Sequence, residues 1–400
     1  MNASNIPAVT LKPGRDKTAR QRHPWIFSGA IAKIEGNPQA GDVVMVVDSD
    51  NKFIAYGHYS PISQIRIRLL DWNNDTKIDD AWWYKKIRSS IERRNNIPDL
   101  ADSNAIRLVY AESDFIPGLI VDKYDDFLIA QFLSCGVDKI KNEIAAILND
   151  IIKPRGIYER SDVEVRKLEG LEPQKGVLSG AEPSNEIIIT ERRIKFGVDI
   201  ISGHKTGLYL DQRYNRKSVA EFAAGKKVLD CFCYGGGFSL YALANKCQNV
   251  TLVDSSQAAL DMANRNVELN GFDLSKAYFV AGDVFEVLRE LRSLGKRFDM
   301  IILDPPKFAP TKKDLKKALS AYKDINLLAL KLLEPDGILA TFSCSGAVDS
   351  QTLQTVLFWA ATDSGRQVQI IQKLSQDIDH PISVTFPESE YLKGFICRVI

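Results

Sequence analysis

The sequence predicts an α/β protein in which a doubly wound, mostly parallel sheet follows a β-rich segment and a small α+β segment. Three observations support this fold class. Period-two patterning dominates the first part of the chain, strand and helix patterns mix in the middle, and strands alternate regularly with helices after residue 226. Because 400 residues exceed one ordinary core, we expect three domains, at 1–77, 78–195 and 196–400.

Composition and charge exclude several classes of protein. Hydrophobic residues make up 45% of the chain and charged residues 26%, as in globular proteins, and the net charge is +1. We find no run of about 18 apolar residues and no secretory signal in residues 1–20, so we expect a cytoplasmic protein without a membrane partner. The 6 cysteines and 4 histidines lack ligand or disulfide spacing, so we expect reduced thiols and no metal.

The β-rich segment carries basic residues directly before two aromatic residues, Trp25 and Phe27. The basic residues are Lys12, Arg15, Lys17, Arg20 and Arg22, and Asp16 is the one acid among them. Cations attract phosphates and aromatic rings stack on unpaired bases, so this stretch suits an RNA surface. Composition alone equally fits a solvated face beside two core aromatic residues, and this alternative stays open.

Patterning after the first segment predicts the remaining elements. In the middle segment we expect helices at 79–96 and 139–152, with strands within 108–132 and 187–201. In the last segment we expect strands at 227–231, 250–254, 277–281, 298–304 and 337–343, each followed by a helix, and two closing strands at 367–373 and 395–400. This is a Rossmann-like order of elements, and such sheets bind ligands at the carboxyl ends of their strands.

Glycines and acids end the first three of these strands. Gly235 and Gly237 lie in a loop after the first strand, where glycine lets the backbone approach a ligand. Asp254 ends the second strand, where it can accept hydrogen bonds from ribose hydroxyls, and Asp283 follows the third, where it can accept from an adenine amino group. Each acid alone could equally cap a turn, but together with the loop they favour a nucleoside-type cofactor. The glycine spacing is not GxGxxG, so a dinucleotide is not expected.

The fourth strand ends in Asp304-Pro305-Pro306-Lys307-Phe308. Asp-Pro-Pro at this place is typical of methyltransferases that act on a planar nitrogen or carbon of a base, and Phe308 is placed to stack on a flipped base. By itself this motif fits amino-group methylation of adenine or guanine.

The fifth strand ends at Cys344, between Ser343 and Ser345, and this cysteine changes the choice of reaction. Cytosine C5 is too weak a nucleophile unless a thiolate adds at C6 while an acid assists at N3. Cys344 and Asp304 end neighbouring strands, so both can face one base. The alternative is that Cys344 is a small packing residue.

These motifs resemble the YccW-like family of bacterial 23S ribosomal RNA cytosine-C5 methyltransferases, essentially from end to end. The carriers are RHPWIFSGA near residue 22, AESDFIPGLIVD near 111, YERSDVEVRKLEG near 158, GHKTGLYLDQR near 203, FCYGGGF near 232, DPPKF near 304, SCSG near 343 and YLKGF near 391. The resemblance implies a PUA-like RNA-binding domain, a central α+β domain and a class I methyltransferase domain that uses S-adenosylmethionine.

The resemblance also implies roles for individual residues, with Cys344 as the nucleophile and Asp304 as the assisting acid. Expected cofactor-binding residues are Lys205, Tyr209, Gln212, Asp230, Phe232, Gly235, Gly237, Asp254 and Asp283. Charge segregation adds expected RNA-binding residues, which are Lys12, Arg15, Arg20, Arg22, Lys307, Lys312 and Lys313. One departure is Gly235, where the family commonly has threonine, and we expect lower cofactor affinity from it.

The sequence therefore predicts S-adenosylmethionine-dependent methylation of cytosine C5 in 23S ribosomal RNA, and it leaves a homodimer open. One alternative is nitrogen methylation of guanine or adenine, which Asp-Pro-Pro would also serve. The other is a non-catalytic RNA-binding assembly factor. Cys344 argues against the first alternative, and the intact acids and glycines argue against the second.

Overall fold

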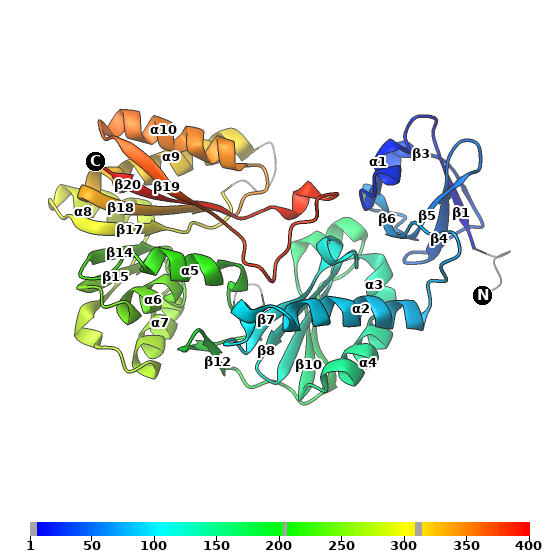
Figure 1. Cartoon of the computed structure of the whole chain (residues 1–400), viewed down its shortest axis with the longest axis horizontal. Coiled ribbons are helices and arrows are strands. Elements are labelled where there is room, and N and C mark those ends of the chain that lie inside the picture. Colours follow the sequence, from blue (N-terminus) through cyan, green and yellow to red (C-terminus); the bar gives the residue numbers. More distant parts are fainter. Residues whose placement is uncertain (1–5, 202, 204–205, 309–313) are drawn as a thin grey trace. The chain divides into compact units, whose positions relative to one another are not determined.

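A computed structural model describes residues 6–201, 203, 206–308 and 314–400, which divide into two units (Figure 1). Unit 1 contains Met1–Ile189, Val198–Leu208 and Asp379–Ser389, and unit 2 contains Thr190–Gly197, Tyr209–Ile378 and Glu390–Ile400. The three predicted domain boundaries stay predictions. None of the helices in the described ranges combines the length and the apolar character that a membrane span requires.

The β-rich part of unit 1 is a six-stranded sheet in the order β2-β6-β5-β4-β1-β3. Its elements are β1 (Ala8–Leu11), α1 (Lys17–Arg20), β2 (Trp25–Phe27), β3 (Ile31–Glu35), β4 (Val43–Val47), β5 (Phe53–Tyr59) and β6 (Ile65–Asp71). Val9, Val46 and Ile67 belong to a hydrophobic core of its own. Apolar and polar residues alternate along the sequence of β6, yet polar Arg68 is also buried, because Glu112 and Glu169 neutralise it at 2.6 and 3.0 Å.

The rest of unit 1 contains a five-stranded sheet in the order β11-β10-β9-β8-β7, packed with helices around a second core. Its elements are α2 (Asp80–Asn95), β7 (Ala105–Tyr110), β8 (Leu119–Tyr124), β9 (Phe127–Phe132), α3 (Cys135–Lys139), α4 (Lys141–Ile152), β10 (Gly156–Ser161) and β11 (Gln174–Gly180). The expected helix at 139–152 is interrupted at Ile140, which separates α3 from α4. A hairpin of β12 (Ile187–Glu191) and β13 (Ile194–Val198) follows in the sequence.

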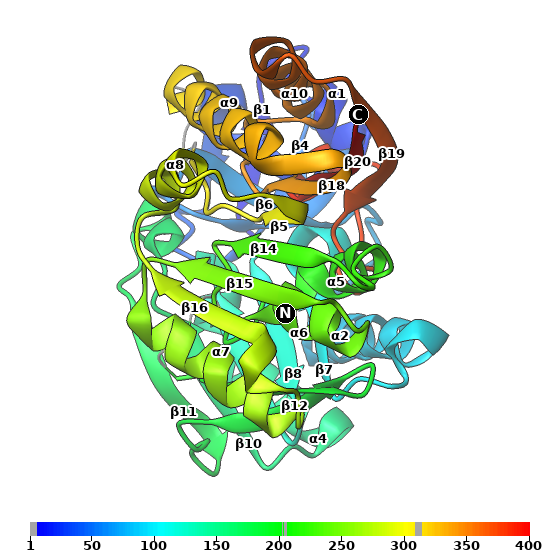
Figure 2. The same cartoon turned by 90° about the vertical axis from the view of Figure 1, so that its left-hand side faces the viewer.

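Unit 2 is built on a seven-stranded sheet in the order β16-β15-β14-β17-β18-β20-β19. Its strands are β14 (Lys227–Cys231), β15 (Asn249–Asp254), β16 (Ala277–Ala281), β17 (Phe298–Leu303), β18 (Leu333–Ser343), β19 (Val368–Ser375) and β20 (Lys393–Val399). Its helices are α5 (Arg213–Ala220), α6 (Gly237–Ala244), α7 (Gln257–Leu269), α8 (Val284–Ser293), α9 (Leu315–Leu332) and α10 (Ser350–Ser364). Figure 2 shows α5, α6 and α7 on one face of this sheet and α8, α9 and α10 on the other. The predicted doubly wound fold is confirmed.

The strand directions in unit 2 place the carboxyl ends of five strands at one edge of the sheet. β14 to β18 are parallel, so their carboxyl ends meet, and Leu303 of β17 pairs with Thr341 of β18. β20 runs antiparallel between β18 and β19, and its first residue, Lys393, pairs with Ser343. The beginning of β20 therefore lies at the carboxyl edge of the parallel strands.

A buried carboxylate, Glu191, joins the hairpin segment of unit 2 to helices α5 and α6. It accepts hydrogen bonds from Arg216 Nε at 3.0 Å and Nη2 at 2.6 Å, and from Tyr241 Oη at 2.9 Å. Arg213 Nε lies 3.6 Å from the same carboxylate. Burial lowers the pKa of Arg216, but Glu191 more than offsets this, so the pKa is raised and the guanidinium stays charged.

We expect Glu191→Ala to destabilise the protein by about 3–5 kcal/mol, because it leaves buried arginine charge uncompensated. Chemical denaturation of the full chain measures this loss in the free energy of unfolding. The matched control is Glu92→Ala, which removes an exposed partner of Arg88 in α2 and should cost about 0.5 kcal/mol or less. Equal losses in the two variants would contradict a structural role for the Glu191 network.

Candidate active site

The loop after β14 brings backbone and polar groups to the carboxyl edge of the unit 2 sheet. Phe232 and Tyr234 have positive φ angles of 62° and 49°, which non-glycine residues rarely adopt. Asp254 stabilises this conformation, because its Oδ2 accepts a hydrogen bond from Tyr234 N at 2.9 Å. Asn266 Nδ2 donates to Gly235 O at 3.0 Å from the neighbouring helix α7. The loop is therefore held in one shape by side chains from two elements.

Gly235 and Gly237 differ in how much space a side chain would have at each position. A Cβ on Gly237 would lie 3.1 Å from Arg216 Cδ, so a side chain there would press on the buried Glu191 network. A Cβ on Gly235 would lie 3.2 Å from Met262 Sδ, near the end of a flexible side chain, and the φ angle is not positive. The backbone at Gly235 thus does not require glycine, which agrees with the expectation that related chains carry threonine there.

Asp254 and Asp283 occupy the carboxyl ends of β15 and β16 as predicted. Asp254 Oδ1 accepts from Ser256 N at 2.9 Å, and Asp283 Oδ1 accepts from Phe285 N at 2.9 Å at the start of α8. Both acids therefore also stabilise a turn or a helix end. Since each carboxylate oxygen has two lone pairs, both keep acceptor capacity for a ligand.

Asp230 lies deeper than a ligand-contacting residue would. It is fully buried at the end of β14, and its Oδ2 accepts from Ser239 N at 3.1 Å and from Ser239 Oγ at 2.6 Å. Burial raises the pKa of Asp230 to about 7. This contact connects β14 to the first turn of α6, so the buried carboxyl stabilises the two elements between which the glycine loop lies.

The segment before α5 brings Tyr209 close to the same edge. Its carbonyl oxygen accepts a hydrogen bond from Arg216 Nη1 at 2.9 Å, and its ring meets the Tyr234 ring edge-on at 5.7 Å. Burial and the nearby Asp304 raise the pKa of Tyr209, so its hydroxyl stays neutral. Gln212 is buried, and its Oε1 accepts from Asn215 Nδ2 at 2.6 Å. The expected contact residue Lys205 lies outside the described residues.

Cys344 and the Asp304 loop lie side by side. Cys344 directly follows β18, Asp304 directly follows the neighbouring β17, and Cys344 Sγ is 3.9 Å from Pro305 O. Cys344 is partly exposed, whereas the other 5 cysteines are buried. Burial raises the pKa of Cys231 and Cys233 well above the usual value and that of Cys397 to about 12. Cys344 is thus the partly exposed thiol at this edge, and its catalytic role stays a prediction.

Sequence reasoning gave no role to Tyr322, which holds the cysteine loop from α9. This buried hydroxyl accepts from Ser343 Oγ at 2.9 Å and lies 3.2 Å from Ser345 Oγ, so it bridges the two residues that flank Cys344. Phe308 packs its ring 4.9 Å from the Tyr322 ring and 6.0 Å from Phe285. Phe308 thus packs against α9 and α8 but stays partly exposed, so the expectation that it stacks on a base stays a prediction.

The expected RNA-binding residues of unit 1 differ in whether an acidic side chain pairs with them. Arg20 is paired with Asp16 at 2.6 Å and also with Asp48 at 2.5 Å, so the basic stretch is opposed by more than the one acid seen in sequence. Lys12 and Arg15 are exposed, and exposed Arg22 lies 5.7 Å from the Trp72 ring centroid.

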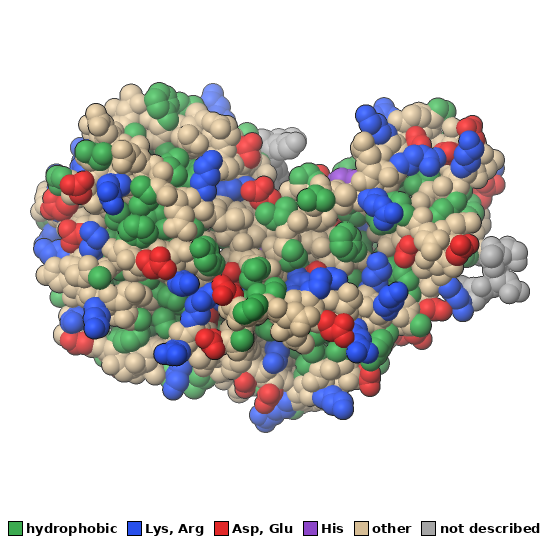
Figure 3. Space-filling view, in the orientation of Figure 1, with side chains coloured by type: hydrophobic (Ala, Val, Ile, Leu, Met, Phe, Trp, Pro, Cys, Tyr) green, Lys and Arg blue, Asp and Glu red, His purple; other side chains and the backbone are tan. Residues whose placement is uncertain are grey.

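In unit 2, Lys307 is exposed after the proline pair, whereas Lys312 and Lys313 lie outside the described residues. On the face shown in Figure 3, Lys and Arg side chains are interspersed with Asp and Glu. Any RNA surface on that face therefore depends on local rather than overall charge.

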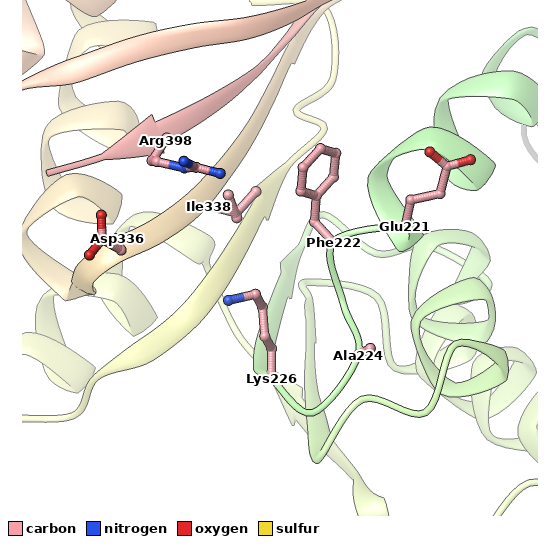
Figure 4. A pocket seen from close by; sticks show the side chains of 7 residues that line it. All are labelled: Glu221, Phe222, Ala224, Lys226, Asp336, Ile338 and Arg398. Carbon is pink, nitrogen blue, oxygen red and sulfur yellow. The ribbon is translucent and has the colours of Figure 1, made fainter.

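Two other features of the structure bear on ligand binding. Within the described part of the chain, no three His, Cys, Asp or Glu side chains gather as metal ligands do. An open pocket of about 530 Å³ lies between Phe222, Lys226, Asp336 and Arg398 (Figure 4). Lys226 precedes β14 and Arg398 lies near the end of antiparallel β20, so this pocket is at the amino edge of the sheet, opposite the Cys344 edge.

Comparison with known proteins identifies both parts of the architecture. A family model for PUA-like domains matches residues 9–72, and one for S-adenosylmethionine-dependent methyltransferases matches residues 173–372. A crystal structure of the methyltransferase SMU.776 complexed with SAH has the same fold, with a TM-score of 0.85 and 22% identity over 98% of this chain and 99% of that one. The chain is therefore an S-adenosylmethionine-dependent methyltransferase with a PUA-like domain, and its expected cofactor is confirmed.

Relatives that are similar over the whole chain show which family of methyltransferases it belongs to. A ribosomal RNA large subunit methyltransferase I from Pseudoalteromonas translucida is 49% identical over 98% of this chain and 99% of that protein. One from Klebsiella pneumoniae is 45% identical over 100% of both. The chain belongs to the ribosomal RNA large subunit methyltransferase I family, as the resemblance of its motifs predicted.

The carboxylate of Asp254 generates a prediction about the cofactor. Asp254→Ala should weaken S-adenosylmethionine binding by about 1.5–3 kcal/mol, because it removes a charged acceptor and the support of Tyr234 N. Titration calorimetry measures the change. Asp273→Ala is the matched control, since Asp273 also caps a turn through Ser275 but precedes β16 at the amino edge. Unchanged affinity in Asp254→Ala would remove Asp254 from the cofactor site.

The raised pKa of Asp230 predicts a pH dependence of stability. Its folded-state pKa of about 7 lies above the ordinary 3.8, so its stabilising contribution is full below pH 3.8 and is lost as pH rises through about 7. Each unit of difference is worth about 1.4 kcal/mol. Melting curves over this range should fall less steeply with pH for Asp230→Asn than for the wild type. Parallel profiles would show that Asp230 does not titrate there.

Proposed function

We propose that this chain methylates C5 of a cytosine in 23S ribosomal RNA through a covalent adduct between Cys344 and C6. One observation carries the proposal: the partly exposed thiol of Cys344 lies beside the Asp304-Pro305 loop, at the edge of the sheet that also bears the glycine loop and Asp254. The names of the relatives, which are ribosomal RNA large subunit methyltransferases, and the PUA-like domain support RNA as the substrate.

The cofactor fits the residues present at this edge. The loop from Phe232 to Gly237 presents backbone beside two acids that keep acceptor capacity, and Tyr209 lies against Tyr234 at its rim. We infer that Gly235, Gly237, Asp254 and Asp283 hold S-adenosylmethionine. When bound, this cofactor supplies the methyl group from its sulfonium centre and leaves S-adenosylhomocysteine.

The chain's own residues perform the addition and the elimination. Cys344 Sγ, as thiolate, forms a bond to C6, and the electron pair of the C5–C6 double bond becomes available at C5. Asp304 donates a proton or hydrogen bond at N3, where negative charge develops. After methyl transfer, a base removes the proton on C5, the C5–C6 double bond re-forms as the Sγ–C6 bond breaks, and N3 returns its proton to Asp304, so the thiolate and the acid are both regenerated.

Nitrogen methylation of guanine or adenine is the second candidate. The Asp304-Pro305-Pro306 motif favours it, because an acid and local carbonyl groups beside the methyl donor also suit an amino group. This reaction would give Cys344 no covalent role, so the two candidates differ in a directly observable product.

RNA that carries 5-fluorocytosine tests the proposed adduct. Fluorine at C5 cannot leave as a proton does, so the Cys344–C6 bond should persist after methyl transfer. A denaturing gel should show a protein–RNA band for the wild type and none for Cys344→Ala. Asp304→Asn should form the band more slowly while it binds the cofactor with unchanged affinity.

Cys397→Ala is the matched control, because it removes a buried thiol from β20 and should keep the band. Circular dichroism verifies that each variant folds. A band that persists in Cys344→Ala would move the nucleophile to another cysteine. Methylation without a band in any variant would favour nitrogen methylation.

A further inference from the structure

Lys393 lies next to the candidate nucleophile although sequence reasoning gave it no role. It is the first residue of β20, where it pairs with Ser343 of β18 on one side and with Ser375 of β19 on the other. Ser343 directly precedes Cys344. Lys393 as a residue is only 5% exposed, and its Nζ donates to Tyr391 O at 3.3 Å. A buried ammonium is therefore fixed at the carboxyl edge of the sheet.

The charged and titratable groups near Lys393 and Cys344 come from several elements, and Asp304, which directly follows β17 beside Cys344, is one of the acids at this edge. Lys393 interacts electrostatically with Glu390, Asp349 and Cys344, and Asp349 is the residue that caps α10. Cys344 is also faced by Tyr209 from the segment before α5 and by Tyr322 from α9. Burial raises the pKa of both tyrosines, so they stay neutral and do not oppose a thiolate.

Burial and the neighbouring groups have opposite effects on the charged form of Lys393. Burial lowers the pKa of Lys393, whereas Glu390, Asp349 and Cys344 act in the opposite direction. An ammonium out of water is costly unless negative groups offset the cost. Two of these groups are carboxylates, and the third, Cys344, becomes negative only when it loses its proton. The two carboxylates already offset the charge of Lys393, but electrostatic coupling is reciprocal, so the ammonium also favours the ionised form of Cys344.

We propose that Lys393 is a positioning residue whose ammonium stabilises the thiolate of Cys344 before any cytosine arrives. This inference rests on the proposed function, because it gives Cys344 the role of nucleophile. The thiol proton passes to solvent, and no redox change or further reactant is needed. A purely structural Lys393, which only fastens the start of β20 to Tyr391 O, would affect folding but not the ionisation of Cys344.

The pH dependence of Cys344 alkylation separates these roles without RNA or cofactor. The full chain is treated with iodoacetamide across a pH series, and mass spectrometry follows the rate at the Cys344 peptide. Lys393→Met should move the midpoint of this profile to higher pH. Well below the midpoint, each unit of upward shift lowers the rate about tenfold, because the thiolate is the reactive form.

Two further variants complete the test. Lys393→Arg keeps the charge and should restore a midpoint close to the wild type. Arg398→Met removes an exposed positive charge from the far end of the same strand and should leave the midpoint unchanged. If Lys393→Met does not fold, Lys393→Gln gives the same comparison, because its amide can still donate to Tyr391 O.

An unchanged midpoint in folded Lys393→Met or Lys393→Gln would overturn the proposal, as would an equal shift in Arg398→Met. The outcome is independent of the proposed reaction. If fluorinated RNA fails to trap Cys344 but the alkylation midpoint moves as expected, the proposed function fails while the effect of Lys393 on the thiol stands.

Discussion

The carboxylate of Glu191 holds together three segments of unit 2 that are distant in sequence. It neutralises Arg216 of α5, accepts from Tyr241 of α6 and belongs to the hairpin segment itself. Arg216 in turn donates to the carbonyl of Tyr209, and its methylene groups pass close to Gly237. The segment that carries Tyr209 and the loop that ends at Gly237 therefore share a single buried charge network. Removing one partner from such a buried network destabilises the protein by several kcal/mol, so we expect its contacts to form together and to be lost together.

Burial also separates one thiol from the others. Cys231 and Cys233 lie within the same few residues as the glycine loop, but desolvation disfavours their ionised forms. Cys344 is partly exposed, and Tyr322 fixes its two flanking serines. Environment rather than residue type thus distinguishes the partly exposed Cys344 from the five buried cysteines.

Much of unit 2 was predictable because its strands are short, apolar and local in pattern. The strands expected at 227–231 and 277–281 coincide with β14 and β16, and Asp254 and Asp304 lie at strand ends as expected. Contacts between distant segments were not predictable. Asp48 reaches Arg20, Asp230 is enclosed with Ser239, and Lys393 meets Ser343 only through strand register. No local pattern encodes which strand a segment will pair with or which charge will neutralise it.

The position of β20 has a consequence for how the chain reaches its native state. β20 inserts between β18 and β19, both of which precede it in sequence, so Gly337 pairs with Val399 across a long stretch of chain. During synthesis on the ribosome, β18 emerges well before its partner and must wait as an open edge. Pairings of this separation are slow to form, and open edges invite intermolecular association. A newly made chain therefore exposes this edge of β18 until residues 393–399 are available to pair with it.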